Sequence, residues 1–167
     1  AGFPVILASH FSYESAPRMP AERMLRQRSF WHRARSVRHG RADALLPPNH
    51  TSRPYVALNR QVEGSASQLR YIEVEHGQHF DAFLPFSGFD TRFVPLHTYF
   101  NQAMDAMWAH LQQGTPLPAH QVVRTTPRGG EPGKAPALTA AHVPPFVVAP
   151  SATNAISLNG TTLNVPR

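Results

Sequence analysis

Residues 71–83 read YIEVEHGQHFDAF, and this stretch decides the fold that the sequence predicts. Its first half alternates in the way that is typical of a β-strand. The stretch then breaks into a histidine, a glycine, a second histidine and an aspartate. Polar side chains directly after a buried strand indicate a loop at its carboxyl end, which is where open parallel sheets carry their active residues.

Helical patterns flank this strand on both sides. We expect the strand to span 69–75, one helix to span 52–62, and a longer helix to span 96–113. Pro95 before the longer helix and Gly114 after it are typical helix boundaries. The longer helix carries apolar residues at spacings of three and four, and we expect them to form its core face against the sheet: Phe100, Met104, Met107, Trp108 and Leu111.

Two loops share the polar pattern. HGRADALLP (39–47) precedes the first helix, and HGQHFDAF (76–83) follows the strand. A helix between strands is what a parallel α/β sheet requires, and adjacent parallel strands bring their loops together. Asp43 and His79 would then lie within hydrogen-bonding reach. The aspartate could fix the tautomer of an imidazole that takes a proton from a hydroxyl nucleophile.

The nucleophile of such a triad is missing from the pattern. No G-x-S-x-G motif occurs, and the serines before Asp43 lack the flanking glycines of a nucleophile elbow. Ser65 and Ser67 follow the acid and are typical of a loop before a strand. The sequence therefore contains two thirds of a triad.

A metal site is the main alternative for the same loop. His76, His79 and Asp81 could bind zinc, with His39 or His50 as a further ligand. However, no H-E-x-x-H helix is present. We expect neither a metal nor a cofactor.

Composition and charge narrow the classes of protein to which the chain could belong. The chain has 167 residues and no cysteine, and it offers no apolar run long enough for a membrane span. Residues 1–41 hold eight arginines against two glutamates, whereas residues 42–167 hold eight basic and eight acidic side chains. The net charge of +6 therefore belongs to one segment. A non-enzymatic binding module, whose basic arm meets acidic partners, is the alternative function; the segment has no motif of a nucleic-acid binder.

Longer stretches support a family resemblance. HGRADALLPPNHTSRPYVALNRQVEG, YIEVEHGQHFDAFLPFSGFDTRFVPLHTYFNQAMDAMWAHL and GTPLPAHQVVRTTPRGGEPGKAPALT resemble the carboxyl-terminal portion of the D-(−)-3-hydroxybutyrate oligomer hydrolases over residues 39–145. The resemblance implies a serine esterase of α/β-hydrolase type that cleaves hydroxybutyrate dimers and oligomers to monomers. It implies Asp43 as the triad acid, His79 as the base, a nucleophile outside this chain, no activity of the chain alone, and an extracellular or periplasmic location.

The organisation expected from these observations has three parts. Residues 39–113 would be the carboxyl-terminal part of an α/β-hydrolase-type parallel sheet with flanking helices, incomplete, with an open edge that favours aggregation. Residues 114–167 would be a proline-rich extended tail, with a hairpin at Asn159-Gly160. Residues 1–38 would be a basic, irregular segment. Its FWHRARSVRHG (30–40) holds too many charges for a strand covered on both faces, so we hypothesise a frameshifted or otherwise non-native origin.

Three arginines leave two interpretations open. Arg53, Arg92 and Arg124 could pair with the terminal carboxylate of a hydroxybutyrate oligomer, or they could form structural salt bridges. The sequence favours salt bridges.

Overall fold

The computed structural model describes residues 34–160 and 162–167. The basic segment 1–38 is thus described only from residue 34, and its proposed non-native origin and its proposed binding to acidic partners lie largely outside the described residues. Among the described helices, none is long and apolar enough to cross a bilayer.

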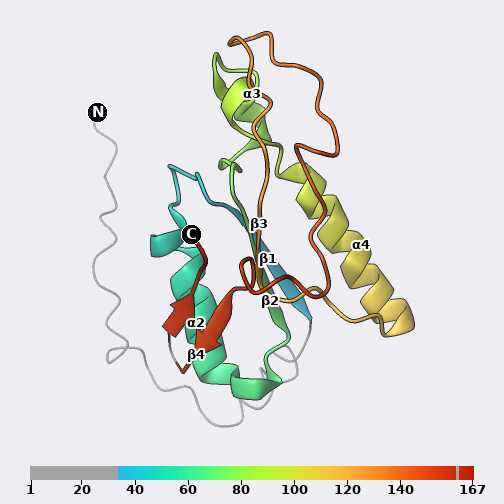
Figure 1. The fold of residues 1–167 in the computed structure, drawn as a ribbon. Helices are drawn as coiled ribbons and strands as arrows, with labels where there is room; N and C mark the ends of the chain where they lie inside the picture. The colour runs from blue at the N-terminus through green and yellow to red at the C-terminus, as the bar shows by residue number, and fades with distance from the viewer. Residues whose placement is uncertain (1–33, 161) are drawn as a thin grey trace, which may run out of the picture. The chain divides into compact units, whose positions relative to one another are not determined.

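Three strands form a parallel sheet in the order β1-β2-β3 (Figure 1). Their bounds are Arg35–Gly40 for β1, Leu69–Val74 for β2 and Gln121–Val123 for β3. The helix α2, Ser52–Glu63, connects β1 to β2 as a parallel crossover requires. Gly40 and Val74 are register partners at the ends of β1 and β2, so the loops that follow these strands start side by side.

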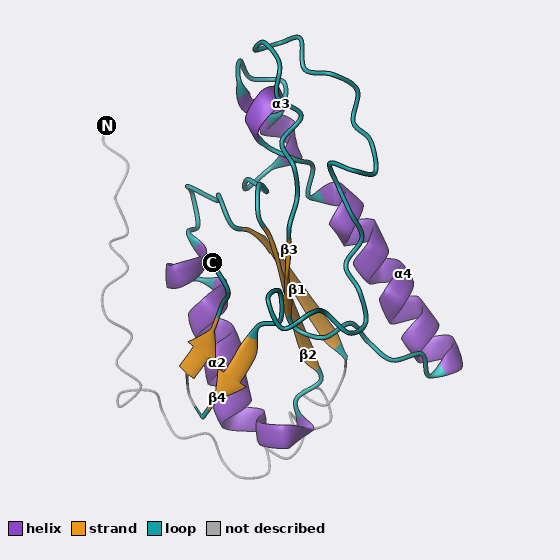
Figure 2. Ribbon diagram, in the orientation of Figure 1, coloured by secondary structure: helices purple, strands orange, loops and turns teal. Residues whose placement is uncertain are grey.

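Apolar side chains cover both faces of β2. One cluster joins Leu69 and Tyr71 to Val56 of α2, and the other joins Ile72 and Val74 to Tyr99 of α4. The helix α4 spans His97–Gln113 and ends at Gly114, which adopts a left-handed φ of 70°. The alternating side chains of β2 thus pack against α2 on one side of the sheet and against α4 on the other. The fold is therefore of the α/β class (Figure 2).

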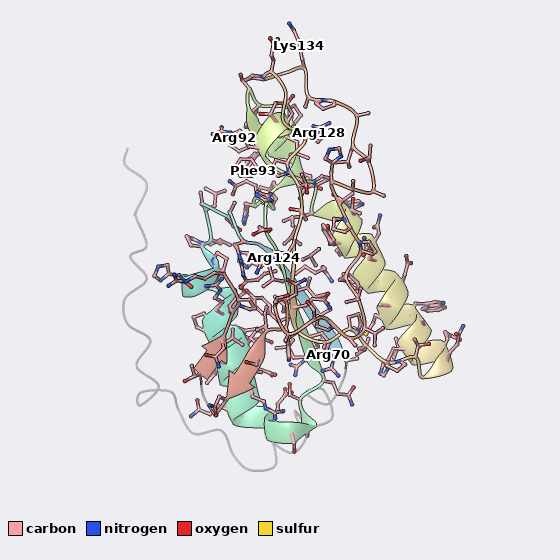
Figure 3. The ribbon with its side chains drawn as sticks, viewed as in Figure 1. Arg70, Arg92, Phe93, Arg124, Arg128 and Lys134 are labelled. Carbon is pink, nitrogen blue, oxygen red and sulfur yellow. The ribbon has the colours of Figure 1, made fainter. Side chains whose placement is uncertain are left out.

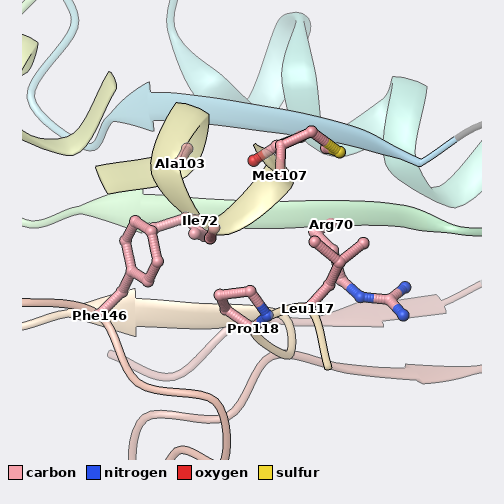
Figure 4. A pocket seen from close by; sticks show the side chains of 9 residues that line it. Arg70, Ile72, Ala103, Met107, Leu117, Pro118 and Phe146 are labelled. Atoms are coloured by element: carbon pink, nitrogen blue, oxygen red, sulfur yellow. The ribbon is translucent and has the colours of Figure 1, made fainter. Parts of the chain in front are cut away.

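The packing of α4 corrects the sequence prediction. We expected Phe100, Met104, Met107, Trp108 and Leu111 to face the core, but Trp108 and Leu111 are 65% and 68% exposed. The buried residues of α4 are Tyr99 and Ala103 instead. Around Ala103, side chains from α4, β2 and residues 117–118 enclose a void of only about 10 Å³ (Figure 4). Such a void is no larger than a single water needs, so this contact is packed rather than a ligand pocket.

The arginine-rich stretch before Gly40 also departs from prediction. We expected no buried strand there, yet β1 occupies residues 35–40. It is an edge strand among the described residues and stays half-buried, so its charged side chains need not be fully desolvated. Arg35 forms an ion pair with Glu63, and the guanidinium of Arg38 lies 4.9 Å from the ring centre of Phe100.

The proline-rich region is partly structured rather than wholly an extended tail. Its residues Gln121–Val123 form β3, the third strand of the sheet. Near the end of the chain, β4 (Ser157–Asn159) and β5 (Thr162–Asn164) pair antiparallel around the Asn159-Gly160 position, where the sequence indicates a hairpin. The short elements are η2 (Pro48–His50), η3 (Gly64–Ala66), η4 (Asp81–Phe83) and α3 (Phe89–Arg92).

Candidate active site

Two glycines let the loops after β1 and β2 touch. A Cβ atom on Gly40 would lie 2.4 Å from the carbonyl oxygen of Gly77, and one on Gly77 would lie 2.9 Å from the Cα of Gly40. The backbone N–H of Ala42 donates to the same Gly77 carbonyl at 3.0 Å. Both loops begin with a His-Gly dipeptide, and the second residue of each must be glycine for the backbones to meet at this distance.

Asp43 and His79 lie side by side above this contact. Oδ2 of Asp43 lies 2.8 Å from Nδ1 of His79, so the expected hydrogen-bonding reach is observed. An ionised carboxylate can only accept, so Nδ1 carries the proton and donates it. The lone pair of the neutral ring is then on Nε2, which is the nitrogen that can act as a base.

The carboxylate of Asp43 is held in its ionised form. Burial raises the pKa of Asp43. The backbone N–H of Leu46, the imidazole of His79 and the backbone N–H of Leu45 together lower it by more, so the pKa lies below its usual value. Both amides donate to Oδ1 at 2.9 Å, which leaves Oδ2 for the imidazole. The residue is 7% exposed, so the pair is shielded from bulk water on the carboxylate side.

His39 is a second imidazole on the same carboxylate, and sequence reasoning considered it only as a metal ligand. Its Nε2 lies 2.8 Å from the carbonyl oxygen of Leu46 and 3.2 Å from Oδ2 of Asp43. Because the carbonyl can only accept, Nε2 of His39 carries its proton and points it at both oxygens. His39 therefore helps to hold the Asp43 carboxylate in place through its Nε2.

Gln78 joins the two loops of the candidate site, and the sequence analysis missed it. Its Oε1 accepts the backbone N–H of Ala44 at 3.0 Å and that of His79 at 3.1 Å. One buried amide thus joins the loop of the acid to the loop of the base. The chain order of loop, helix, strand and loop indicated that the two loops meet, but nothing in the pattern singled out the glutamine.

The remaining polar residues of the second loop point away from His79. Asp81 accepts the backbone N–H groups of Leu96 and His97 at 2.7 and 2.8 Å, and so anchors the start of α4. His76 binds Thr125 through Nδ1 at 3.0 Å. The described residues contain no group of three or more histidines or carboxylates placed to hold a metal ion, and the alternative ligand set of the sequence analysis is not brought together there.

A buried glutamate supports the first loop from below. Glu73 of β2 is fully buried, and it accepts hydrogen bonds from Arg41, Arg53 and Tyr71 at 2.6 to 3.0 Å. Burial raises its pKa, whereas Arg53, Tyr71 and Arg41 lower it more, so the pKa lies below its usual value and the charge persists. Arg41 also donates to the carbonyl of Pro166, which ties the acid loop to the end of the chain.

The three arginines considered for substrate binding have protein partners. Arg53 pairs with Glu73 as described above, and Arg124 pairs with Glu75 at 2.9 Å. Arg92 donates to the carbonyl of Gly88 and lies over the rings of two phenylalanines, one of them labelled beside it in Figure 3. The structural interpretation of these side chains is thus favoured over recognition of a substrate carboxylate.

A chain of aromatic rings adjoins His79. His79 meets Phe80 edge-on with 4.0 Å between ring centres, and Phe80 is about half exposed. Ring contacts continue through Phe83 to Phe86, which is also exposed. Within the described residues, no hydroxyl group is hydrogen-bonded to Nε2 of His79. The pair therefore presents an oriented imidazole in contact with the ring of Phe80, and Nε2 of this imidazole is available to accept a proton.

Comparison with known proteins gives a consistent result. The family model described as 3HB-oligomer hydrolase matches residues 14–167. A relative from Paracidovorax citrulli (strain AAC00-1) is 60% identical over 132 residues, which cover 77% of this chain and 19% of the relative. A relative from Burkholderia mallei (strain SAVP1) is 58% identical over 135 residues, covering 81% of this chain and 19% of the relative. Both are described as D-(-)-3-hydroxybutyrate oligomer hydrolases.

The chain thus spans about a fifth of the length of these relatives. No solved structure gives a significant match.

Proposed function

The chain belongs to the 3HB-oligomer hydrolase family, and from this premise we propose that it supplies the acid and base of a catalytic triad that hydrolyses 3-hydroxybutyrate oligomers. The observation that carries the proposal is the 2.8 Å contact between Asp43 and His79 at the carboxyl ends of adjacent parallel strands. This is the position and the pairing in which α/β-hydrolases hold the same two groups.

The chemistry follows from the tautomer. Nε2 of His79 removes the proton of a hydroxyl group as its oxygen bonds to the ester carbonyl carbon. The imidazolium that forms is stabilised by Asp43, and it returns the proton to the alkoxide as the ester bond breaks. Water then attacks the acyl group with the same base, releasing the acid and restoring the hydroxyl. The net reaction consumes one water and yields one carboxylic acid and one alcohol.

The proposed enzyme is an α/β-hydrolase-type serine esterase of which this chain forms part. We propose that the serine and the amides that bind the oxyanion lie outside the residues that the structure describes, because no G-x-S-x-G motif occurs in the chain. The exposed rings of Phe80 and Phe86 offer an apolar surface for the methyl-bearing chain of the substrate. Export of the enzyme remains a proposal that rests on the resemblance alone.

A chimeric enzyme tests this function. The matched 132 residues of the Paracidovorax citrulli relative are replaced by the corresponding residues of this chain, and release of 3-hydroxybutyrate from its dimer is measured. We expect turnover in the chimera and a loss of about 10⁴ or more after His79→Ala, as in other triads. His50→Ala is the matched control, because His50 is an exposed histidine at the end of η2 and makes no contact with His79 among the described residues.

Two results bear directly on the proposal. Turnover that survives His79→Ala would show that another group is the base. Equal losses for His79→Ala and His50→Ala would show a general effect on folding. The chain by itself is expected to release no product and not to react with a serine-directed phosphonate.

A further inference from the structure

The backbone N–H groups of the acid loop, residues 41–46, all have acceptors among the described residues. Three of these groups donate to residues 40–43 on their own side. The others donate across to the strand and loop of the base: to the carbonyl oxygens of Val74 and Gly77 at 2.7 and 3.0 Å, and to Oε1 of Gln78 at 3.0 Å. A row of three hydrogen bonds therefore joins the acid loop to the side of the base.

Gln78 differs from the other two acceptors of this row. Val74 and Gly77 accept through backbone carbonyl oxygens, whereas Gln78 accepts through its side chain. The same Oε1 also accepts the backbone N–H of His79 at 3.1 Å. Because both partners are N–H donors, the atom between them is the oxygen of the amide, and the orientation of the amide is fixed. The residue is 9% exposed, so water has little access to replace this oxygen.

The backbone of Gln78 is fixed as well. A Cβ atom on Gly40 would lie 2.8 Å from the carbonyl oxygen of Gln78, so this part of the base loop, residues 75–79, packs directly on the end of β1. Just before it, Gly77 closes a turn by donating its N–H to the carbonyl oxygen of Val74 at 3.2 Å. The side chain of Gln78 therefore starts from a defined point and reaches two defined N–H groups.

These hydrogen bonds close a ring around the candidate pair. The N–H groups that meet at Oε1 of Gln78 belong to His79 and to Ala44, the residue after the acid. The 2.8 Å contact between Nδ1 of His79 and Oδ2 of Asp43 completes the ring. Gln78 thus sets the separation of the two backbones, and the contact between the side chains sets the direction of the imidazole. Without Oε1, both side chains could rotate about their χ angles and keep their mutual contact while Nε2 moves.

We propose that Gln78 is a positioning residue of the triad, whose amide oxygen holds Nε2 of His79 at the place where a hydroxyl group must deliver its proton. This inference rests on the proposed function, because only an imidazole that acts as a base needs such a defined position. Gln78 acts through the backbone of His79, so it should affect turnover more than substrate binding. A displacement of about 1 Å can lower turnover by about 10².

Kinetics of the chimeric hydrolase test the role of the oxygen. Gln78→Leu removes the acceptor and should lower kcat by about 100-fold. Its KM should stay within about threefold, because substrate contacts are unchanged. Gln78→Glu keeps an oxygen acceptor of the same reach, and its kcat at its own optimal pH should stay within about fivefold of the unaltered chimera. Gln112→Leu, at an exposed glutamine of α4, is the matched control and should change neither constant.

Two precautions separate turnover from folding. Turnover is expressed per folded enzyme, with the folded fraction taken from circular dichroism at the assay temperature. Gln78→Met, which also lacks the acceptor, is measured beside Gln78→Leu with the same expectation, so the test does not depend on one variant that folds. A purely structural role would lower the folded fraction and leave the kcat of the folded enzyme unchanged.

Amide exchange tests the link without any activity. In the full chain, hydrogen exchange of the Ala44 and His79 amides is followed by NMR. Gln78→Leu should speed exchange at both positions by about tenfold or more, and Gln78→Glu should leave them protected. The amide of Glu75, which donates to the carbonyl oxygen of Val123, is the internal control and should not change.

Several results would overturn the inference. An unchanged kcat in Gln78→Leu, or unchanged exchange of the two amides, would show that Oε1 does not hold the base. Equal losses of kcat in Gln78→Leu and Gln78→Glu would show that the oxygen acceptor is not what matters. A higher KM with kcat retained would assign the side chain to substrate binding.

A failure of the proposed function would look different. An unaltered chimera without turnover, or one whose turnover survives His79→Ala, would refute the proposed function and this inference with it, even where the amides of Ala44 and His79 are protected. A chimera that depends on His79 and is indifferent to Gln78→Leu would overturn this inference alone.

Discussion

Acidification should destabilise the folded chain through one buried imidazole, that of His120. Its Nδ1 lies 3.0 Å from the backbone nitrogen of Tyr71 and accepts that N–H, so the folded ring is neutral with its proton on Nε2. Burial, followed by the charges of Arg70 and Arg60, lowers its pKa from the ordinary 6.5 to about 4. A proton added to Nδ1 would meet the amide proton of Tyr71 and break the bond.

The size of the effect follows from the two pKa values. Between pH 6.5 and 4, the unfolded imidazole binds a proton that the folded one does not, so the stability is complete above 6.5 and is lost as the pH falls toward 4. Each pH unit of difference is about 1.4 kcal/mol, which gives an upper limit of about 3 kcal/mol. About 2 kcal/mol of this is lost between about pH 7 and about pH 4.5.

Urea unfolding at these two pH values measures the loss. His120→Asn is the comparison, because its side-chain oxygen can accept the Tyr71 amide and does not titrate in this range. The pKa values of the Asp43, Glu73 and Asp90 carboxylates are lowered in the folded chain, so these groups stay charged in this window and are the same in both proteins. The free energy of unfolding should fall by about 2 kcal/mol more in the unaltered chain than in His120→Asn. Parallel losses in the two proteins would refute the assignment to His120.

Three further predictions concern the site and its support. In the chimeric hydrolase, Asp43→Asn should lower kcat by about 10⁴ with little change in KM, because the imidazole loses its orientation and its counter-charge; steady-state kinetics measure both. Gly40→Ala should destabilise the fold by about 1–3 kcal/mol in urea unfolding, since its Cβ would lie 2.4 Å from the carbonyl oxygen of Gly77. Glu73→Gln should cost about 3 kcal/mol by the same measurement, because the partly buried guanidinium groups of Arg41 and Arg53 would lose the negative charge that pairs with them. Glu131→Gln, at an exposed ion pair, is its control and should change nothing measurable.

Local rules predicted several elements of the fold. The helix expected at 52–62 spans Ser52–Glu63, and the strand expected at 69–75 spans Leu69–Val74. The periodicity of apolar residues and the residues typical of helix ends are local properties of the sequence, so they can be recognised before any tertiary contact is known. Local rules failed for β3, which is a three-residue strand between prolines and has no pattern long enough to detect.

The Asp43–His79 pair was predictable from the topology of the sheet. The prediction missed the side chains that hold this pair in place, because their contacts depend on three-dimensional geometry. A strand, a crossover helix and a second strand require the loops of Asp43 and His79 to meet at one rim, and they do. The same rule says nothing about side chains that join the loops. Gln78 and His39 act through single contacts between residues distant in sequence, and no spacing rule marks such residues.

The sequence by itself determined which residues share a helix face and which acid meets which imidazole, because these follow from period and chain order. Only the tertiary structure decided whether a face is covered. The apolar stripe of α4 was assigned to the core from its period, yet Trp108 and Leu111 are exposed. Arginines were held to exclude a strand before Gly40, yet an edge strand forms there. Period reports the direction of a side chain, whereas burial depends on what lies opposite, and that is a property of the assembled fold.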